Sequence, residues 1–162
     1  MRKMSEVELL PMSESEFQSY LERAVKRYAQ ENIKAGYRTV DDAERRSQED
    51  HLRLLPLGIE TPCNYLLVIK EKASSRSVGA LWLRTEDDGR PVGFVYDIFL
   101  EEEERGRGLG KATMRALEEF ARGKGLKALY LHVFAHNHVA MRLYQGSGYQ
   151  VKSMNMEKLL EE

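Results

Sequence analysis

The chain has 162 residues, 42% of them hydrophobic, which suffices for one well-cored domain and is too short for two ordinary ones. Its 25 Lys and Arg residues balance 26 Asp and Glu residues to a net charge of -1, which excludes a general attraction to nucleic acid or to an anionic membrane. The single cysteine, Cys63, cannot form an internal disulfide, and the chain shows no signal-peptide core and no apolar run of about 20 residues. We therefore expect a single cytoplasmic domain over residues 1–162, without a nucleic-acid or membrane partner; a homodimer is left open.

The first third of the chain predicts one strand and two helices. VELLPM, residues 7–12, has the pattern of a short strand, and SESE, residues 13–16, has the S-x-x-E form of a capping box at the start of a helix. Apolar residues recurring at intervals of three and four extend this helix to about Gly36. A second helix is expected at about 41–55, with an exposed polar middle and with the leucines of 52–55 anchoring its end.

The rest of the chain predicts a mixed sheet. Apolar runs separated by short, turn-rich links indicate an antiparallel meander, followed by a glycine-rich stretch and a helical stripe. Because a strand–helix–strand crossover of this length joins parallel strands, VGFVYDIFL and KALYLHVF are expected to pair in parallel. A short helix and a final strand, YQVKSMNMEKL, complete an α+β fold. The expected strands are 65–70, 77–83, 92–100, 127–134 and 149–159, and the later helices are 109–121 and 137–148.

The stretch ERGRGLGKAT places three glycines where a strand passes into a helix. Glycine in a helix costs roughly 1 kcal/mol relative to alanine, so the glycines indicate a requirement for bare backbone, most simply a ligand lying against it. The Walker A pattern and the dinucleotide pattern G-x-G-x-x-G both fail here. A helix N-terminus still attracts an anion through its free N–H groups and dipole, and Arg105, Arg107 and Lys111 add charge. A phosphate or pyrophosphate is therefore the expected ligand, with a solvated glycine-rich connector as the alternative.

Two motifs in the second half of the chain together resemble the GNAT superfamily of acetyl-CoA-dependent N-acetyltransferases. One has the form [QR]-x-x-G-x-[GA] and follows the family's fourth strand. The other has the form N-x-x-A-x-x-L-Y, followed by G-[FY], and comes after the fifth strand. The matching residues are Arg105, Gly108 and Gly110 in the first motif and Asn137, Ala140, Leu143, Tyr144, Gly148 and Tyr149 in the second. The resemblance covers nearly the whole chain and implies the GNAT fold, a mostly antiparallel mixed sheet flanked by helices, in which parallel strands four and five splay apart.

The resemblance implies a binding site for acetyl-CoA, with coenzyme A as the product. Backbone amides of the glycine-rich stretch would hold the pyrophosphate, and backbone groups of strand four would pair with the pantetheine arm. Asn137 would steady the pantetheine from the other side, and an N-cap of the short helix is the alternative role for this residue. The cofactor-binding residues implied are Ile98, Leu100, Arg105, Gly106, Arg107, Gly108, Leu109, Gly110, Lys111 and Asn137.

Acetylation of an amine requires a base that takes a proton from the ammonium group and a donor that protonates or stabilises the leaving thiolate. Tyr144 stands at the family's general-acid position, and its phenol stays protonated at neutral pH. A core tyrosine on an amphipathic helix is the alternative. The oxyanion of the reaction would be held by a strand N–H near Ile98.

The position at which many members of the family carry the catalytic base holds a different residue type in this chain. Many members of the family carry glutamate two residues before Ile98, where this chain has Tyr96. Other members place a carboxylate in strand five, in the pattern L-E-V-x-x-x-N, and here the corresponding residue is His132, five residues before Asn137. An ordinary histidine, with a pKa near ~6.5, accepts a proton well at pH 7. We therefore predict His132 as the catalytic base, with a packing histidine as the alternative.

Two other sets of residues near the predicted base could take part in chemistry. Asp97, a carboxylate in the right strand, is the alternative candidate for the base, but strand alternation predicts that it faces away from Tyr96, which favours a role in orienting the backbone or a neighbour. His136 and His138 lie close to His132 in sequence, but no carboxylate or thiol completes a metal-binding set with them. We expect no metal.

The acceptor amine is not identified by the sequence. The first two expected helices carry mixed charge, so a small molecule such as a polyamine, amino sugar or amino acid and a protein amine all remain open. Glu60 is either an anchor for a second amino group or an ordinary solvated residue. A different class of function is also open, a non-catalytic acyl-CoA-binding sensor, which would need the glycines and Asn137 but neither Tyr144 nor His132.

Overall fold

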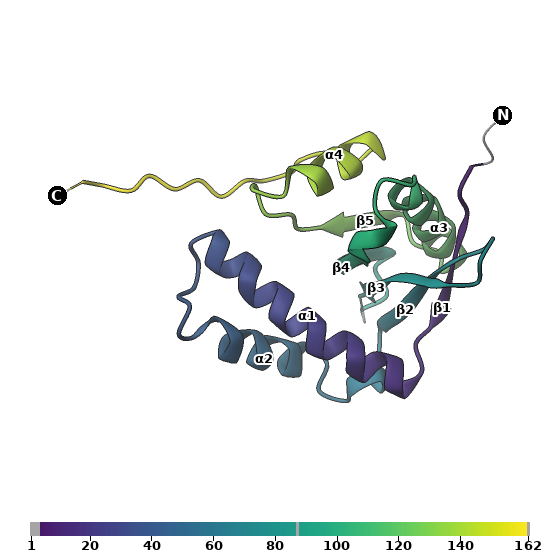
Figure 1. Ribbon diagram of the computed structural model, residues 1–162, viewed down its shortest axis with the longest axis horizontal. Coiled ribbons are helices and arrows are strands. Elements are labelled where there is room, and N and C mark those ends of the chain that lie inside the picture. Colours follow the sequence, from purple (N-terminus) through teal and green to yellow (C-terminus); the bar gives the residue numbers. More distant parts are fainter. Residues whose placement is uncertain (1–3, 87, 162) are drawn as a thin grey trace.

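The computed structural model describes residues 4–86 and 88–161. Its centre is a five-stranded sheet in which the strands follow one another in chain order (Figure 1). The second, third and fourth strands form the expected antiparallel meander, the first strand pairs antiparallel with the second, and the fifth pairs in parallel with the fourth. The strands are β1 Val7–Pro11, β2 Asn64–Glu71, β3 Ser77–Thr85, β4 Val92–Leu100 and β5 Ala128–Leu131. The helices are α1 Glu14–Lys34, α2 Ala43–Leu54, α3 Leu109–Gly123 and α4 His138–Gly146, with short 3₁₀ turns η1 Gly58–Glu60 and η2 Glu102–Glu104.

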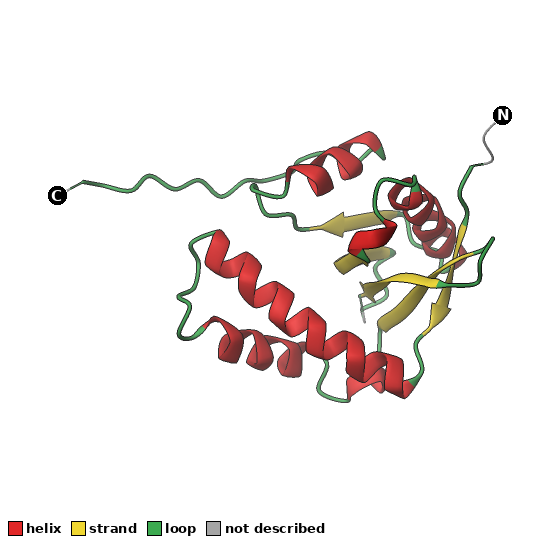
Figure 2. Cartoon of the chain, in the orientation of Figure 1, coloured by secondary structure: helices red, strands yellow, loops and turns green. Residues whose placement is uncertain are grey.

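Each face of the sheet carries its own apolar core. On one face α1 packs through Phe17 against side chains of β2 and β3 that include Trp82. On the other face α3 packs through Leu117 against residues that include Leu81, and side chains of α4 adjoin this second core. Figure 2 shows the resulting layers, with the α1–α2 pair and α3 on opposite sides of the strands. The alternation of apolar residues along the strands explains this arrangement, because successive side chains point to opposite faces.

The helices of the first third largely follow the sequence prediction. Ser13 and Glu16 form the capping box reciprocally, with backbone-to-side-chain hydrogen bonds of 2.9 and 3.1 Å. The prediction for α2 is only half right. Ser47, in its polar middle, is buried and donates a hydrogen bond to the Val25 carbonyl at 2.7 Å. Leu52, expected to anchor the helix, is 70% exposed.

A β-bulge interrupts β4. Trp82 of β3 lies opposite Asp97, but the next residue of β3 lies opposite Val95, so Tyr96 is the extra residue. The bulge places Tyr96 and Asp97 on the same face, because the Tyr96 ring stacks on Trp82 at 4.6 Å and Asp97 accepts a hydrogen bond from Tyr20 of α1. The prediction that Asp97 faces away from Tyr96 is therefore wrong, since strict alternation ends at the bulge.

The parallel strands β4 and β5 diverge soon after they meet. They pair only between residues 92–95 and 128–131, while β4 continues to Leu100. The expected splay of these two strands is confirmed. The fifth strand is shorter than KALYLHVF, so His132 lies just beyond its end rather than within it.

The predicted final strand does not form. Within the described chain, residues 150–161 adopt neither helix nor strand and are exposed throughout, and we call them the C-terminal tail. Figure 1 shows the tail leaving the body of the protein as an extended segment. A strand needs a neighbour to pair its N–H and C=O groups, and the single chain brings none to this segment.

Candidate active site

The glycine turn, residues 105–111, connects η2 to α3. Gly106 and Gly108 have φ angles of +78° and +77°, in the left-handed region that other residues rarely adopt, and Gly108 is the N-cap of α3. No heavy atom lies within 4 Å of the position that a Cβ would take at either glycine. The turn therefore requires these two glycines for its backbone shape and leaves open space beside them.

At position 110 glycine is needed for a different structural reason, the close packing of two helices. A Cβ at this position would lie 3.2 Å from a methyl group of Leu143, so the glycine allows α4 to pack closely on the first turn of α3. The sequence pattern attributed all three glycines to one ligand. The structure assigns the third of them to helix packing.

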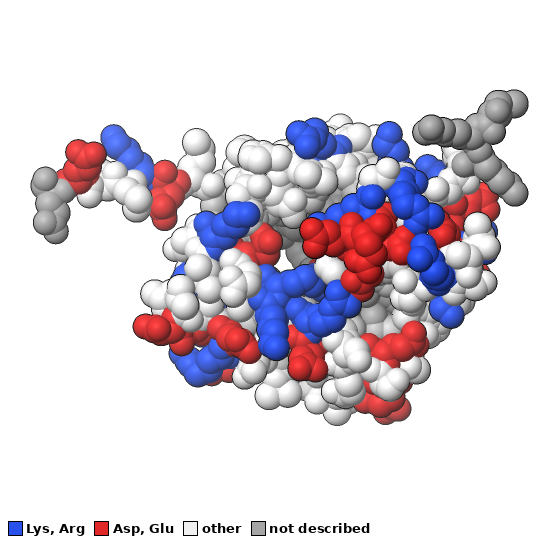
Figure 3. Space-filling model, in the orientation of Figure 1, with Lys and Arg blue, Asp and Glu red and all other residues white. Residues whose placement is uncertain are grey.

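The first turn of α3 offers unpaired backbone donors. The first helical hydrogen bond runs from the Ala112 N–H to the Gly108 carbonyl at 3.2 Å, which leaves the N–H groups of Leu109, Gly110 and Lys111 without helical partners. Figure 3 shows basic side chains beside an acidic group over the link between β4 and α3. The donors and the positive end of the helix dipole make this a place where an anion would be stabilised.

The guanidinium of Arg107 is held in ion pairs and is not free to bind an anion in this space. Its guanidinium donates a hydrogen bond to Glu71 of β2 at 2.7 Å and is paired with Glu104 of η2. Both carboxylates are only 6% exposed, and Arg76 pairs with Glu104 at 2.9 Å. The Arg107 side chain thus ties the glycine turn to the sheet, and any part it plays in binding an anion would fall to its backbone.

We expect Arg107→Met to destabilise the protein by about 2 kcal/mol, because two buried carboxylates would lose a charged partner. The estimate is below the usual value for a fully buried pair because Arg107 is itself 43% exposed. For a chain of this size it corresponds to a fall of roughly 4–8 °C in melting temperature. Arg122→Met is the control, since that arginine is 73% exposed in its ion pair with Glu118, and should leave the melting temperature within about 1 °C.

The open edge of β4 presents backbone groups to the splay. The Glu101 N–H donates to the Val78 carbonyl of β3 at 2.8 Å, so this residue faces β3. Because the backbone groups of alternate residues point to opposite sides of a strand, those of Ile98 and Leu100 face the side that β5 has left. The Arg105 Nε donates to the Leu100 carbonyl on this side at 3.3 Å. The two residues named by the sequence thus lie at the open edge.

Asn137 caps α4. Its side-chain oxygen accepts a hydrogen bond from the Ala140 N–H at 3.2 Å, which confirms the N-cap alternative. A role in binding pantetheine remains a prediction for the amide group.

Tyr144 lies on α4 against the core on the α3 side of the sheet, with its ring 5.9 Å from that of Tyr149. Burial raises the pKa of the Tyr144 phenol to about 12, and the negative charge of Asp97 adds to the effect. The phenol is fully protonated at neutral pH and can act as a hydrogen-bond donor.

Asp97 is already engaged by α1. Its carboxylate accepts hydrogen bonds from the Tyr20 hydroxyl at 2.7 Å and from Arg27 at 3.0 Å. Burial, and secondly the Asp97 charge, raise the pKa of Tyr20 well above its usual value. Asp97 therefore joins α1 to β4, which agrees with the orienting role predicted for it and leaves the role of base untested.

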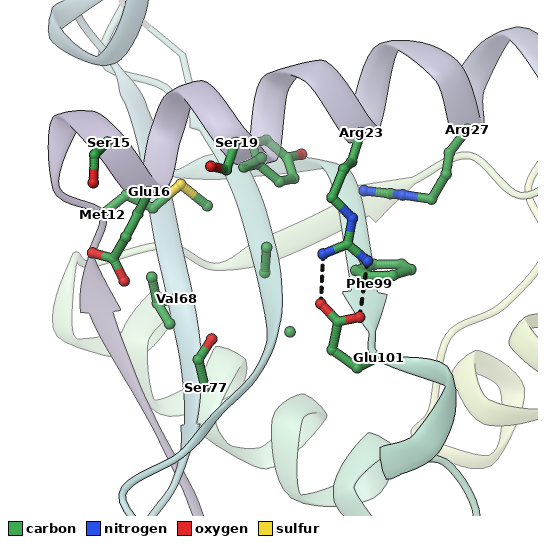
Figure 4. A pocket seen from close by; sticks show the side chains of 13 residues that line it. Met12, Ser15, Glu16, Ser19, Arg23, Arg27, Val68, Ser77, Phe99 and Glu101 are labelled. Carbon is green, nitrogen blue, oxygen red and sulfur yellow. Dashed lines mark hydrogen bonds and ion pairs between the residues drawn. The ribbon is translucent and has the colours of Figure 1, made fainter.

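A cleft of about 260 Å³ opens beside this contact, between α1 and strands β3 and β4. Figure 4 shows Arg23 and Arg27 reaching from α1 towards the sheet, where Arg23 binds Glu101 through two hydrogen bonds of 2.7 and 2.8 Å. The Arg27 guanidinium lies 4.0 Å from the centre of the Phe99 ring. These contacts fix α1 against the part of β4 that follows the bulge.

The histidines after β5 lie among aromatic rings. His132 is exposed, and its ring meets Phe134 edge-on at 4.9 Å. His136, which the sequence considered only as a metal ligand, is paired through Nε2 with Glu31 of α1 and stacks on Phe134 at 5.5 Å. The sequence could not have indicated this histidine–glutamate pair, because 105 positions separate its members.

Within residues 4–86 and 88–161, no group of three or more His, Cys, Asp or Glu side chains could hold a metal ion. No helix in the same part of the chain is long and apolar enough to cross a membrane.

The divergence of β4 and β5 beside a glycine turn agrees with the acetyltransferase fold that the sequence motifs imply. Comparison with known families leads to the same class, because the model of the Acetyltransferase (GNAT) family matches residues 20–149. The chain belongs to this family and is an acyltransferase.

Two curated relatives come from Bacillus subtilis (strain 168), and both are named uncharacterized N-acetyltransferases. YycN is 40% identical over 153 residues, which cover 94% of this chain and 97% of YycN. YdgE is 34% identical over 150 residues, which cover 92% of this chain and 95% of YdgE. The crystal structure of YycN aligns with 96% of this chain and 99% of its own, with a TM-score of 0.92. An aminoglycoside N-acetyltransferase, AAC(6')-Iy in complex with CoA, shares the fold at 15% identity, with a TM-score of 0.54 over 99% of this chain and 98% of its own.

Proposed function

We propose that the protein transfers the acetyl group of acetyl-CoA to a primary amine by direct attack within a ternary complex, in the cytoplasm. The observation that carries this proposal is the splay between β4 and β5, where the backbone groups of Ile98 and Leu100 face away from β3 and the protonated phenol of Tyr144 packs against the same core as these two residues. Acetyl-CoA supplies an activated acetyl thioester. The acceptor is a small-molecule amine or a protein amine.

The residues that would hold the coenzyme A moiety lie along one path. The free N–H groups of Leu109, Gly110 and Lys111 would bind the pyrophosphate, with Gly106 and Gly108 giving the turn its shape. The open edge of β4 at Ile98 and Leu100 would pair with the pantetheine arm as a neighbouring strand would. Asn137 would approach from α4, and the exposed side chains of Arg105 and Lys111 would add positive charge. A CoA complex is known for the structural neighbour AAC(6')-Iy, which shares only the fold.

Tyr144 would donate a hydrogen bond to the sulfur that leaves. An ordinary thiol has a pKa near ~8.5, so complete proton transfer from a phenol with a pKa of about 12 would be uphill by about 5 kcal/mol. Stabilisation of the developing thiolate by a fully protonated donor is therefore the better description of its role than release of a free proton. Hydrogen bonds to a charged group are about twice as strong as neutral ones, and the buried site strengthens them further.

His132 would take the proton from the acceptor ammonium, directly or through water. Its ring is exposed beyond the end of β5, where an amine approaching from the α1 side of the sheet could reach it. His136, held by Glu31, is a second imidazole after β5 on this side. The two histidines can be separated by mutation, as argued in the Discussion.

Coenzyme A binding tests the first half of this proposal. We expect coenzyme A and acetyl-CoA each to raise the melting temperature, because a ligand that binds only the folded state stabilises it by mass action. Gly108→Val should abolish the shift, since valine rarely adopts a φ of +77° and would distort the turn that presents the N–H groups.

The matched control is Gly125→Val. Gly125 also has a φ of +77° with open space around it, but it lies at the other end of α3. The control should lose similar stability through backbone strain and keep its response to coenzyme A. Normal coenzyme A binding by folded Gly108→Val would show that the glycine turn does not hold the pyrophosphate.

A further inference from the structure

Aromatic rings line the side of the site from which an acceptor would enter. Coenzyme A would lie at the glycine turn, on the α3 side of the sheet, so the α1 side is left for the acceptor (Figure 2). There the ring of Phe134, in the link between β5 and α4, lies 6.3 Å from the ring of Tyr28 and 6.3 Å from that of Tyr37, measured between ring centres. The Phe134 ring also meets His132 at 4.9 Å. An aromatic surface thus adjoins the predicted base.

Two of these rings are accessible to a ligand. Tyr37, in the loop that follows α1, is 53% exposed, and Tyr28 of α1 is 38% exposed. The face of an aromatic ring attracts a cation, and its large apolar area favours contact with a hydrocarbon chain. This surface therefore suits a ligand that has methylene groups and a positive charge.

A carboxylate lies at the far end of the aromatic surface. Glu31 of α1 pairs with His136, whose ring stacks on that of Phe134 at 5.5 Å. Figure 1 shows this end of α1 beside the link that follows β5. The Glu31 side chain is 39% exposed, and within the described chain its only ion pair is with His136. Glu31 is thus an acidic group that a ligand can reach, two ring contacts away from His132.

Three arginines of α1 and of the loop that follows it are each held by a carboxylate. The pairs are Arg23 with Glu101, Arg27 with Asp97 and Arg38 with Asp50, at 2.7, 3.0 and 2.7 Å. An acceptor that carried its own carboxylate would have to displace one of these partners and would be repelled by Glu31. The charges on this side therefore favour an acceptor with a second positive group over an acidic one.

We propose that the acceptor is a linear α,ω-diamine, of which one amino group is acetylated at the splay and the other is bound by the Glu31 carboxylate. This inference rests on the proposed function. The methylene chain between the two groups would lie on the rings of Phe134, Tyr28 and Tyr37. The bound amino group, an alkyl ammonium with a pKa near ~10.4, is charged at neutral pH and would replace His136 as the partner of Glu31.

The reacting end follows the chemistry of the proposed function. His132 takes one proton from the ammonium group, the freed nitrogen forms a bond to the acetyl carbon, and the bond from that carbon to sulfur breaks. The sulfur leaves with the electron pair, and the second proton lost by the nitrogen neutralises the thiolate. The distant ammonium group keeps its charge throughout, so Glu31 would bind substrate and transition state alike and act mainly on KM.

The first test compares diamines from diaminopropane to diaminopentane with alkylamines of equal length as acceptors. For the best length, the wild-type protein should favour the diamine in kcat/KM by about 10- to 100-fold, the usual gain from a hydrogen bond to a charged group. Glu31→Gln should reduce this ratio to about threefold or less, mainly through a higher KM for the diamine, because a neutral amide does not pair with an ammonium group. Glu22→Gln is the matched control and should keep the full ratio, since this exposed residue lies nine positions earlier, on the opposite face of α1.

The second test measures binding without turnover. Calorimetry of the protein loaded with coenzyme A should show that the favoured diamine binds and that Glu31→Gln weakens this binding about 10-fold or more. Binding that depends on Glu31, without turnover of any amine, would support the cation site and contradict the proposed function. No binding that depends on Glu31, or turnover with a diamine preference that is absent or survives Glu31→Gln, would overturn the diamine assignment; turnover of other amines would then leave the proposed function standing.

Discussion

Tyr144→Phe is expected to lower kcat for the best amine acceptor by roughly 10²-fold or more, while coenzyme A still binds and still raises the melting temperature. The loss follows from the removal of a protonated donor next to the developing thiolate, and phenylalanine keeps the ring that packs against the core. Because the pKa of Tyr144 is about 12, the wild-type rate should show no decline from this residue as pH rises through 10, where an ordinary tyrosine would ionise.

The chain offers a closely matched control in Tyr149→Phe. Tyr149 adjoins Tyr144, and burial likewise raises its pKa to about 12, but its buried hydroxyl has no hydrogen-bond partner among the described residues. Removing that hydroxyl should leave kcat within about threefold and should not lower the melting temperature, because an unpaired buried polar group contributes no stability. Equal losses in both variants would mean that Tyr144 acts through packing and not through its hydroxyl.

His132→Ala is expected to cost on the order of 10²-fold in kcat/KM at neutral pH. With histidine as the base, the wild-type kcat/KM should show a lower rise with pH as the imidazole loses its proton, and a further rise at higher pH as the amine itself loses its proton. The variant should lack the lower rise and keep the upper one. Tyr144→Phe should lower the whole profile without moving the lower rise, since it acts on the sulfur and not on the amine.

Two further histidine variants locate the base. His138→Ala changes an exposed residue at the start of α4 and should have little effect. His136→Ala breaks the pair with Glu31 and should leave the lower limb of the profile in place if His132 is the base. Loss of that limb in His136→Ala, with its retention in His132→Ala, would transfer the role to His136.

The sequence predicted the fold wherever local pattern decides it. The capping box at Ser13, the three-strand meander of β2, β3 and β4 and the parallel crossover through α3 all follow from short-range signals and are confirmed. The bulge at Tyr96 was missed because it depends on the register between two strands and not on the residues of β4 alone. The orientation of Asp97 was wrong for the same reason.

The sequence predicted the backbone shape of the candidate site but not the residues with which its side chains pair. Positive φ angles at Gly106 and Gly108 agree with a turn that needs glycine, which sequence can indicate. The Arg107 side chain turns towards the sheet because it pairs with Glu71. This glutamate is 36 positions away and looks like any surface glutamate in the sequence. The predicted final strand has strand-like composition, but a strand also needs an edge to join, and local pattern does not show where that edge lies.

The central claim, transfer of acetyl from acetyl-CoA to an amine, is tested most directly by measuring coenzyme A release from acetyl-CoA in the presence of a panel of primary amines. The panel should include a polyamine, an amino sugar, an amino acid and a lysine peptide, with the amine-free rate as background and mass spectrometry to identify the acetylated product. We predict release that depends on at least one amine, a product heavier by one acetyl group, and loss of both in Tyr144→Phe. Binding of acetyl-CoA without amine-dependent release for any acceptor class would contradict the account and would favour a module that binds the cofactor without catalysis.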